Sequence, residues 1–116
     1  VILIGGKLFK HSVVAVGAAA IETIGRIRAD IYFMGATGIH PKAGVTTGDL
    51  EESYVKRAMS QSAAETILLA SAEKLNAASP YLIVSLAELS GIVTEKSVAE
   101  EVTKPFADLG MTVTRA

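Results

Sequence analysis

The stretch IYFMGATGIHPKAGVTTGDLEESYVKRAM, residues 31–59, decides the fold of this chain. Its first four residues are apolar and are followed at once by Gly35, a pattern typical of a strand buried in a parallel sheet. Residues 35–48 are rich in glycine and threonine, and we expect them to form one long loop. Long ordered loops in compact domains are often functional, so this segment is the first place to look for a binding site.

A helix follows the expected loop. Asp49 can cap its first turn, and Glu52 stands three residues later, in the position of a capping box. Val55, Met59 and Ala63 recur at a helical spacing and are expected to form its buried side. A strand, a glycine-rich connection and a capped helix in succession are typical of one unit of an α/β fold.

The alternation continues on both sides of this unit. Apolar runs predict further strands at residues 1–4, 66–69, 82–84, 92–94 and 111–114, and helical spacing predicts a helix over 17–28. A last helix is expected to begin at Ser97, with Glu100 in its capping box, a kink or break at Pro105 and an end at Gly110. Residues 7–16 are expected to be extended, and residues 71–80 irregular with one helical turn. The chain is therefore predicted to be an α/β protein with a mostly parallel sheet flanked by helices.

Composition limits the functions that this fold can serve. The chain has 116 residues, enough for a single domain over residues 1–116, and 50% of them are hydrophobic. A formal charge of −1 without a basic cluster argues against a nucleic-acid surface. The longest apolar stretch, residues 13–21, is well short of the ~20 residues that span a membrane. The chain has no cysteine and only two, distant histidines, so we expect no metal centre and a cytoplasmic location.

Ligands in open α/β sheets bind beyond the carboxyl ends of the strands. Gly35, Thr37 and Gly38 directly follow such an end. Glycine lets the backbone approach a ligand closely, and exposed amides can bind an anion. A plain tight turn is the alternative interpretation.

Two neighbouring features can complete an anion site. Thr46 and Thr47 precede a helix N-terminus, where free amides and the helix dipole favour negative charge, although Asp49 can fill that position as an ordinary cap. Glu52 and Lys56 are four residues apart and share one helix face. They can form a surface ion pair worth ~0.3–0.5 kcal/mol, or Lys56 can reach a phosphate held at the helix start.

Other polar residues have weaker patterns. His40 can contact a ligand or be solvated. Ser71 and Lys74 follow an expected strand and reach the same edge of the sheet if that strand is parallel, with a solvated loop as the alternative. No catalytic set is visible, because Thr37 cannot act as a general base and capping or pairing accounts for the nearby acids.

Several segments occur together in the order of a known family. They are IGGKL (4–8), GATGI (35–39), GVTT (44–47), LEESYVKRAM (50–59), LASAEK (69–74) and GMTV (110–113). With them the chain resembles the C-terminal sensor domain of DeoR-family bacterial transcription regulators over essentially its whole length. The resemblance implies the fold of ribose-5-phosphate isomerase, glucosamine-6-phosphate deaminase and coenzyme A transferases. It also implies a domain that senses a phosphorylated sugar or related metabolite, without a cofactor.

The resemblance assigns a ligand site as well. The residues that match the family's motifs are Gly35, Thr37 and Gly38 after the strand, Thr46 and Thr47 before the helix, and Glu52 and Lys56 on it. Many members carry aspartate where this chain has Thr37, which argues against catalysis and leaves the hydroxyl preference of the site open. Two alternatives remain: a sugar-phosphate isomerase or deaminase on the same fold, and an oligomerisation domain with a vestigial site.

Sensor domains of this family begin with a strand–loop–helix unit that carries a phosphate loop, and this chain starts after it. We therefore expect a fragment, truncated at its N-terminus, that binds its effector more weakly than the intact domain and exposes apolar surface. A helix-turn-helix domain outside this chain would bind operator DNA. A homo-oligomer is expected, because bacterial regulators usually bind paired half-sites.

Overall fold

The computed structural model describes residues 3–9 and 14–116. The elements follow one another in this order: β1 (Lys7–Phe9), β2 (Val14–Val16), α1 (Ala18–Gly25), β3 (Ala29–Met34), β4 (Gly38–His40), β5 (Gly44–Thr47), α2 (Leu50–Gln61), β6 (Ala63–Leu69), a 3-10 turn (Ala72–Lys74), β7 (Tyr81–Val84), a 3-10 turn (Leu86–Glu88), β8 (Gly91–Thr94), α3 (Glu100–Ala107) and β9 (Val113–Arg115). β1 and β2 pair in an antiparallel arrangement, which agrees with the extended structure expected at residues 7–9 and 14–16; residues 10–13 lie outside the described residues.

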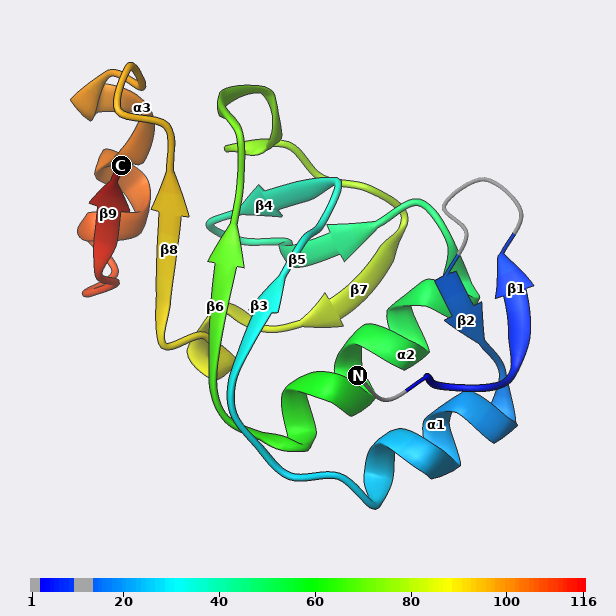
Figure 1. The fold of residues 1–116 in the computed structure, drawn as a ribbon. Coiled ribbons are helices and arrows are strands. Elements are labelled where there is room, and N and C mark those ends of the chain that lie inside the picture. The colour runs from blue at the N-terminus through cyan, green and yellow to red at the C-terminus, as the bar shows by residue number, and fades with distance from the viewer. Residues whose placement is uncertain (1–2, 10–13) are drawn as a thin grey trace.

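The centre of the fold is a parallel sheet of four strands in the order β3-β6-β8-β9. Because the strands are parallel, their carboxyl ends meet at one edge, the upper edge in Figure 1. The α/β architecture with a parallel sheet is confirmed. The chain segments that leave β3 and β6, residues 35–37 and 70–74, therefore emerge side by side.

A second, antiparallel sheet of β4, β5 and β7 was not expected. The prediction of a single loop over residues 35–48 was wrong, because this segment is mostly a hairpin. Its turn is held by His40, whose Nδ1 accepts hydrogen bonds from the amides of Lys42 (3.0 Å) and Ala43 (3.3 Å). Gly44 continues the turn at a positive φ of 80°, which L side chains rarely adopt.

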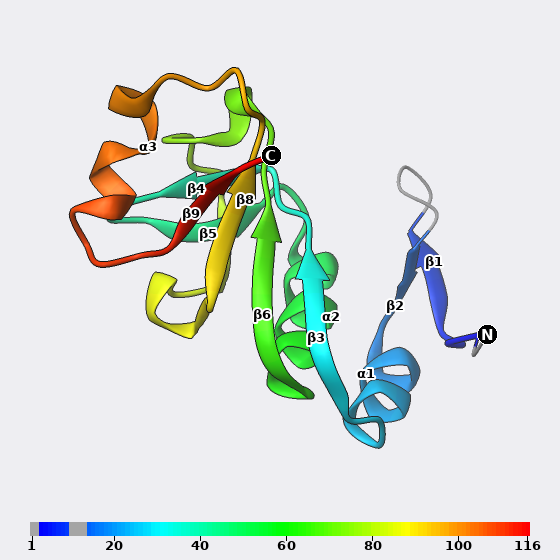
Figure 2. The same cartoon turned by 60° about the vertical axis from the view of Figure 1, so that its left-hand side comes forward.

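The main core lies between the two sheets and α3. Met34, Leu68 and Ile92 of the parallel sheet pack against Ile39 and Ile83 of the small sheet, with Phe106 of α3 in the same cluster. Figure 2 shows α3 and the small sheet on one side of the parallel sheet. Most of the fold's apolar burial is therefore on one face of that sheet.

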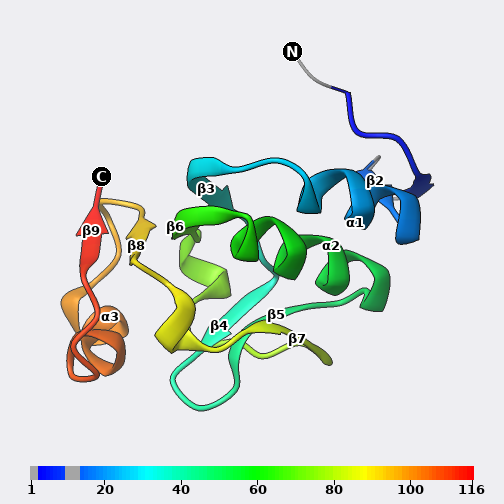
Figure 3. The same ribbon diagram turned by 90° about the horizontal axis from the view of Figure 1, so that it is seen from below.

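A smaller cluster joins the helices near the N-terminus. Val16, Ile24 and Val55 are buried together, so that α1 and α2 lie side by side, as seen from below in Figure 3. Within the described residues, no helix is long and apolar enough to cross a membrane.

The opposite face of the parallel sheet is open over the edge strand β3 and its neighbour β6. Ile31, Phe33 and Leu69 are 42%, 58% and 46% exposed. The expectation that residues 31–34 form a strand was correct, but its full burial was wrong, because β3 is an edge strand. Of the strand expected over residues 1–4, Leu3 and Ile4 are described; they are not in a strand, and Leu3 is 92% exposed. Val1 and Ile2 lie outside the described residues.

The expected start of α2 was correct, but the expected boundaries of α3 were not. Asp49 caps α2 as expected, accepting a hydrogen bond from the amide of Glu52 at 2.9 Å. Ser97 does not cap α3: the N-cap is Ala99, without a side-chain cap. The helix also continues through Pro105 to Ala107, so the expected break there was wrong. Ala63, expected on the buried side of α2, begins β6 instead.

Candidate functional site

Lys56 lies in the middle of α2 and extends toward the end of β3. Its ammonium group donates a 2.7 Å hydrogen bond to the carbonyl oxygen of Gly35, the first residue after the strand. The side chain is half-buried. The helix thus delivers a single positive charge to the edge where the parallel strands end, the place at which open α/β sheets bind ligands.

The surroundings of Lys56 change its acid–base behaviour. Burial lowers the pKa of the ammonium group below its usual value of 10.5, because the charged form is poorly solvated. The nearby carboxylate of Glu52 opposes this shift of the pKa, whereas the charge of Lys74 adds to it. Lys56 is therefore a cation that an incoming anion would stabilise.

Glu52 and Lys56 do not form the simple surface ion pair that their spacing allowed. Glu52 is only 9% exposed. The ion pairs within the described part of the chain join Arg26 to Glu22 and Lys104 to Asp108, both on exposed helix surfaces. Glu52 acts on Lys56 through its charge instead.

Thr37, Thr46 and Ser79 form a hydroxyl network beside this charge. The amide of Thr37 donates to the carbonyl oxygen of Thr46 at 3.1 Å, and its hydroxyl is hydrogen-bonded to the Ser79 hydroxyl. The Thr46 hydroxyl is buried; it accepts from the amide of Ser79 at 2.8 Å and donates to the carbonyl oxygen of Gly38 at 3.4 Å. The buried Thr46 side chain thus connects Gly38 to Ser79 inside the fold, while Thr37 is exposed.

The two glycines of the turn have different roles. A Cβ on Gly38 would lie 2.5 Å from the carbonyl oxygen of Ala77, so only glycine lets the segment 71–80 pass this closely. A Cβ on Gly35 would meet nothing within 4 Å, and its carbonyl oxygen already binds Lys56. Gly38 serves the packing of the turn, and Gly35 contributes a main-chain acceptor.

The helix N-terminus is occupied by its own cap. The Asp49 carboxylate accepts from the amide of Glu52, which leaves less room for an anion there. Thr47 is 1% exposed, and its hydroxyl has no hydrogen-bond partner among the described residues. Consecutive strand residues point to opposite faces, so Thr47 faces away from the hydroxyl of Thr46. These contacts bring Thr46, but not Thr47, to the turn after β3.

Lys74 reaches the same edge from the neighbouring strand. β6 is parallel to β3, as its expected placement required, and a 3-10 turn follows it at Ala72–Lys74. A shallow depression beyond β6 and β8 is lined by Ser71, Lys74 and Glu95 among others. We call Gly35, Thr37, Glu52, Lys56, Lys74 and Ser79 together the strand-exit site.

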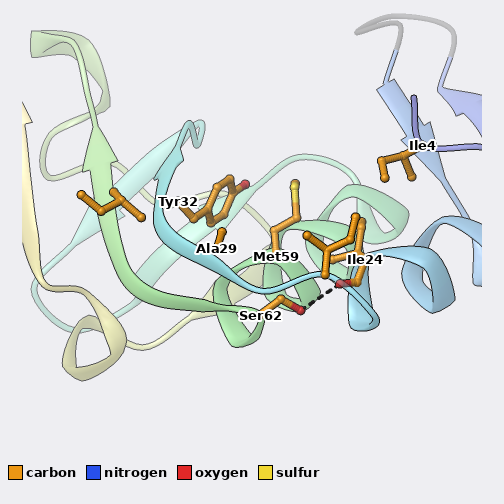
Figure 4. A pocket seen from close by; sticks show the side chains of 8 residues that line it. Ile4, Ile24, Ala29, Tyr32, Met59 and Ser62 are labelled. Carbon is orange, nitrogen blue, oxygen red and sulfur yellow. Dashed lines mark hydrogen bonds between the residues drawn. The ribbon is translucent and has the colours of Figure 1, made fainter. Parts of the chain in front are cut away.

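An apolar pocket of about 200 Å³ lies elsewhere, between α1, α2 and β3. Figure 4 shows Ile24, Tyr32 and Met59 around it. Its serine, Ser62, already donates to the carbonyl oxygen of Ile24 at 3.1 Å. Burial raises the pKa of the Tyr32 phenol to about 12, so it stays neutral. The lining contains no positive charge, so the pocket is poorly suited to an anion, whereas the strand-exit site has two lysines.

Among the described residues, no three histidine or acidic side chains gather around a common point. His40, a candidate ligand contact in the sequence, instead holds the β4–β5 turn. Ser79 was missed altogether, because it stands in an irregular segment without a motif. Its position depends on Thr37 and Thr46, more than thirty residues away along the chain.

Comparison with known proteins shows the family of this chain. Residues 1–96 match the family described as the DeoR C terminal sensor domain. The chain is 34% identical over 94 residues to the HTH-type transcriptional repressor GlcR of Bacillus subtilis, covering 81% of this chain and 36% of that protein. It is 28% identical over 111 residues to the HTH-type transcriptional regulator GlpR of Haloferax volcanii, covering 96% of this chain and 44% of that protein.

A further relative is the HTH-type transcriptional regulator GolR of Listeria innocua, 26% identical over 113 residues, which cover 97% of this chain and 44% of that protein. The chain therefore spans less than half the length of the curated relatives that it matches. These relatives are named as regulators of transcription, and residues 1–96 match a sensor-domain family, so this domain is a regulatory sensor. The match over residues 1–96 shows that the chain belongs to the DeoR C-terminal sensor domain family.

Proposed function

We propose that this domain binds a phosphorylated sugar, or a related anionic sugar metabolite, at the strand-exit site. The observation that carries the proposal is the position of Lys56, half-buried and fixed on the Gly35 carbonyl at the carboxyl edge of the parallel sheet. An ammonium group has three donors, and one of them is used on Gly35. The remaining donors are available to an anion.

The charges around Lys56 favour an anion with more than one negative charge. Lys74 lies close enough to disfavour the charged form of Lys56, and this repulsion is relieved when a phosphate group lies between the two ammonium groups. Lysine is a common phosphate partner as a point charge. Partial burial strengthens the attraction relative to a fully solvated lysine.

The sugar part of the ligand would contact neutral groups next to this charge. Thr37 is exposed at the end of the turn, and its hydroxyl can donate or accept a hydrogen bond. Of the residues assigned from the family motifs, we keep Gly35, Thr37, Glu52 and Lys56 as ligand-site residues. Gly38, Thr46 and Thr47 are proposed to support the site through the backbone and packing.

Effector binding would act on a larger protein. We propose that residues 1–116 are the sensor part of a cytoplasmic homo-oligomeric regulator, whose separate helix-turn-helix domain binds operator DNA. The support is that the relatives are named as HTH-type regulators and extend well beyond the matched region. A ligand changes operator affinity only if it binds one conformation of the regulator more tightly than another.

Thermal unfolding of the 116-residue chain tests the ligand class. Sugar phosphates, each beside its unphosphorylated parent sugar, are compared on the wild type and on Lys56→Met, which removes the charge and keeps a similar length. Lys104→Met is the matched control, because Lys104 is an exposed lysine on α3. A ligand at about 100 times its Kd should add about 2.7 kcal/mol of stability.

The expected result is stabilisation by one or more sugar phosphates, absent with the parent sugars, lost in Lys56→Met and retained in Lys104→Met. Equal stabilisation of the wild type and Lys56→Met would contradict the proposed site. Equal effects of a sugar phosphate and its parent sugar would contradict the proposed ligand class. A regulator whose response survives Lys56→Met would favour an oligomerisation domain with a vestigial site.

A further inference from the structure

Ser79 is held in place by a buried threonine. Its amide donates a 2.8 Å hydrogen bond to the hydroxyl of Thr46, a side chain that is only 3% exposed. The irregular segment 71–80 also passes Gly38 so closely that a Cβ there would meet the Ala77 carbonyl oxygen. Ser79 is therefore fixed by its backbone, although it stands in a segment without regular structure.

The Ser79 hydroxyl is hydrogen-bonded to that of Thr37. The backbone of Thr37 is fixed as well, because its amide donates to Thr46 at 3.1 Å. Thr37 is exposed and Ser79 half-buried, so the paired hydroxyls are open to a solute. Two rigid backbones thus present a preformed pair of neutral hydroxyls at the strand exit.

A second serine–threonine pair in the chain is buried, and it shows how a purely structural pair differs from the exposed Thr37–Ser79 pair. The hydroxyls of Ser60 and Thr66 are 2.8 Å apart, but Thr66 is 2% exposed and the pair lies between α2 and β6. That pair satisfies two hydroxyls inside the fold. The Thr37–Ser79 pair is in contact with solvent, where internal satisfaction is not required.

We infer that Ser79, together with Thr37, determines which sugar the domain accepts, by hydrogen bonding to neutral hydroxyl groups of the ligand. This inference rests on the function proposed above. The positive charges of Lys56 and Lys74 attract the anionic group, and they do so for any sugar. Each hydroxyl has one donor and two acceptor positions. The Thr37 hydroxyl lies 3.4 Å from the Thr46 carbonyl oxygen, to which it can donate, and one donor is used between the two hydroxyls, so acceptor positions remain for a sugar hydroxyl.

Binding measurements by calorimetry separate the attraction of the anionic group by the lysines from the recognition of the sugar by the two hydroxyls. The probes are inorganic phosphate, ribose 5-phosphate and glucose 6-phosphate, and the 2-deoxy analogues of both sugars. The variants are Ser79→Ala, Thr37→Val and, to keep the hydroxyl, Thr37→Ser. Ser60→Ala is the matched control, because it breaks a bond of the same type outside the strand-exit site.

We expect Ser79→Ala and Thr37→Val to weaken binding of the preferred sugar phosphate by about three- to tenfold, the usual effect of a neutral hydrogen bond. Inorganic phosphate should bind these variants as it binds the wild type. The ratio of the affinities for the sugar phosphate and its deoxy analogue should also fall in these two variants. Thr37→Ser, which keeps the hydroxyl, should have the wild-type ratio. Ser60→Ala should lower thermal stability, but the affinities for the sugar phosphates, their deoxy analogues and inorganic phosphate should keep their wild-type ratios.

Two other results would overturn the inference and are distinguishable. If Lys56→Met abolishes binding but Ser79→Ala and Thr37→Val leave every ratio of affinities unchanged, the specificity role fails and the proposed function stands. If Lys56→Met binds the sugar phosphates as tightly as the wild type does, the proposed function fails and the specificity role fails with it.

Discussion

The ammonium group of Lys56 lies 2.7 Å from the carbonyl oxygen of Gly35, and this contact joins the middle of α2 to the end of β3. It spans 21 positions of the chain and fixes a charge at the edge of the parallel sheet. The consequences of this contact, and of the caps and glycines that support it, can be measured.

Ligand affinity should depend on the protonation of Lys56. Because burial lowers the pKa of its ammonium group, affinity for a sugar phosphate should begin to fall at a pH below 10.5 as that group loses its proton. Calorimetric titrations at increasing pH above 7.5 measure this fall. The control variant Lys104→Met should show the same fall, and a wild-type affinity that stays constant up to pH 10.5 would argue against the role of Lys56.

Without ligand, Lys56 should have the opposite effect: its contribution to the free energy of unfolding should rise with pH, whereas the ligand affinity falls. A lysine whose pKa is lowered by folding binds its proton more weakly than in the unfolded chain. Its contribution to the free energy of unfolding therefore rises with pH between the lowered pKa and 10.5. Urea unfolding of the wild type and Lys56→Met across this range compares the two slopes, and a steeper rise in the variant would contradict the shift.

Gly38→Ala should destabilise the domain by about 1–3 kcal/mol, the usual cost of overpacking. Its Cβ would stand 2.5 Å from the Ala77 carbonyl oxygen, a main-chain atom that cannot move without displacing the segment 71–80. Gly48→Ala is the control, since a Cβ there meets nothing within 4 Å. Equal free energies of unfolding for both variants would show that the close approach is absent in solution.

Asp49→Ala should cost about 1 kcal/mol, because the carboxylate caps the amide of Glu52. Ser97→Ala should change the free energy of unfolding by less than about 0.5 kcal/mol, as expected for a surface residue without such a role. Denaturant unfolding compares the two variants. An equal loss in both would mean that Ser97 also acts as a cap.

Tyr32 should contribute to stability at neutral pH and lose that contribution in alkali. Burial raises the pKa of its phenol from 10.0 to about 12, so the contribution is complete below pH 10 and disappears as pH rises toward 12. Melting temperatures of the wild type and Tyr32→Phe between pH 9 and 12 measure it. Curves that stay parallel over this range would refute the assignment.

The sequence predicted features that depend on nearby residues. The cap at Asp49 needs only the three residues that follow it, and α1, α2 and the four parallel strands follow from local apolar spacing. The hairpin of β4 and β5 was missed because its strands have only three and four residues. Its stability comes from pairing with β7, far along the chain.

Local patterns also failed where a competing contact was stronger. Ser97 has the residue type of a cap, but the amide of Val98 donates to the carbonyl oxygen of Glu95 and closes a turn there, so α3 begins later. Ser79 could not be recognised at all, since its partner Thr37 is 42 positions away. Lys56 was chosen as a candidate from its motif, but its contact with Gly35 is visible only in the three-dimensional structure.

The main-chain character of the Gly35 acceptor has a consequence for how such a sensor can change its preference over time. Every residue has a carbonyl oxygen, so substitutions in the turn do not remove the group that holds Lys56. Thr37, two positions further on, can therefore vary while the ammonium group of Lys56 keeps its place. On the function proposed above, single substitutions in this turn would change the sugar that a sensor prefers and leave in place the charge that attracts its anionic group.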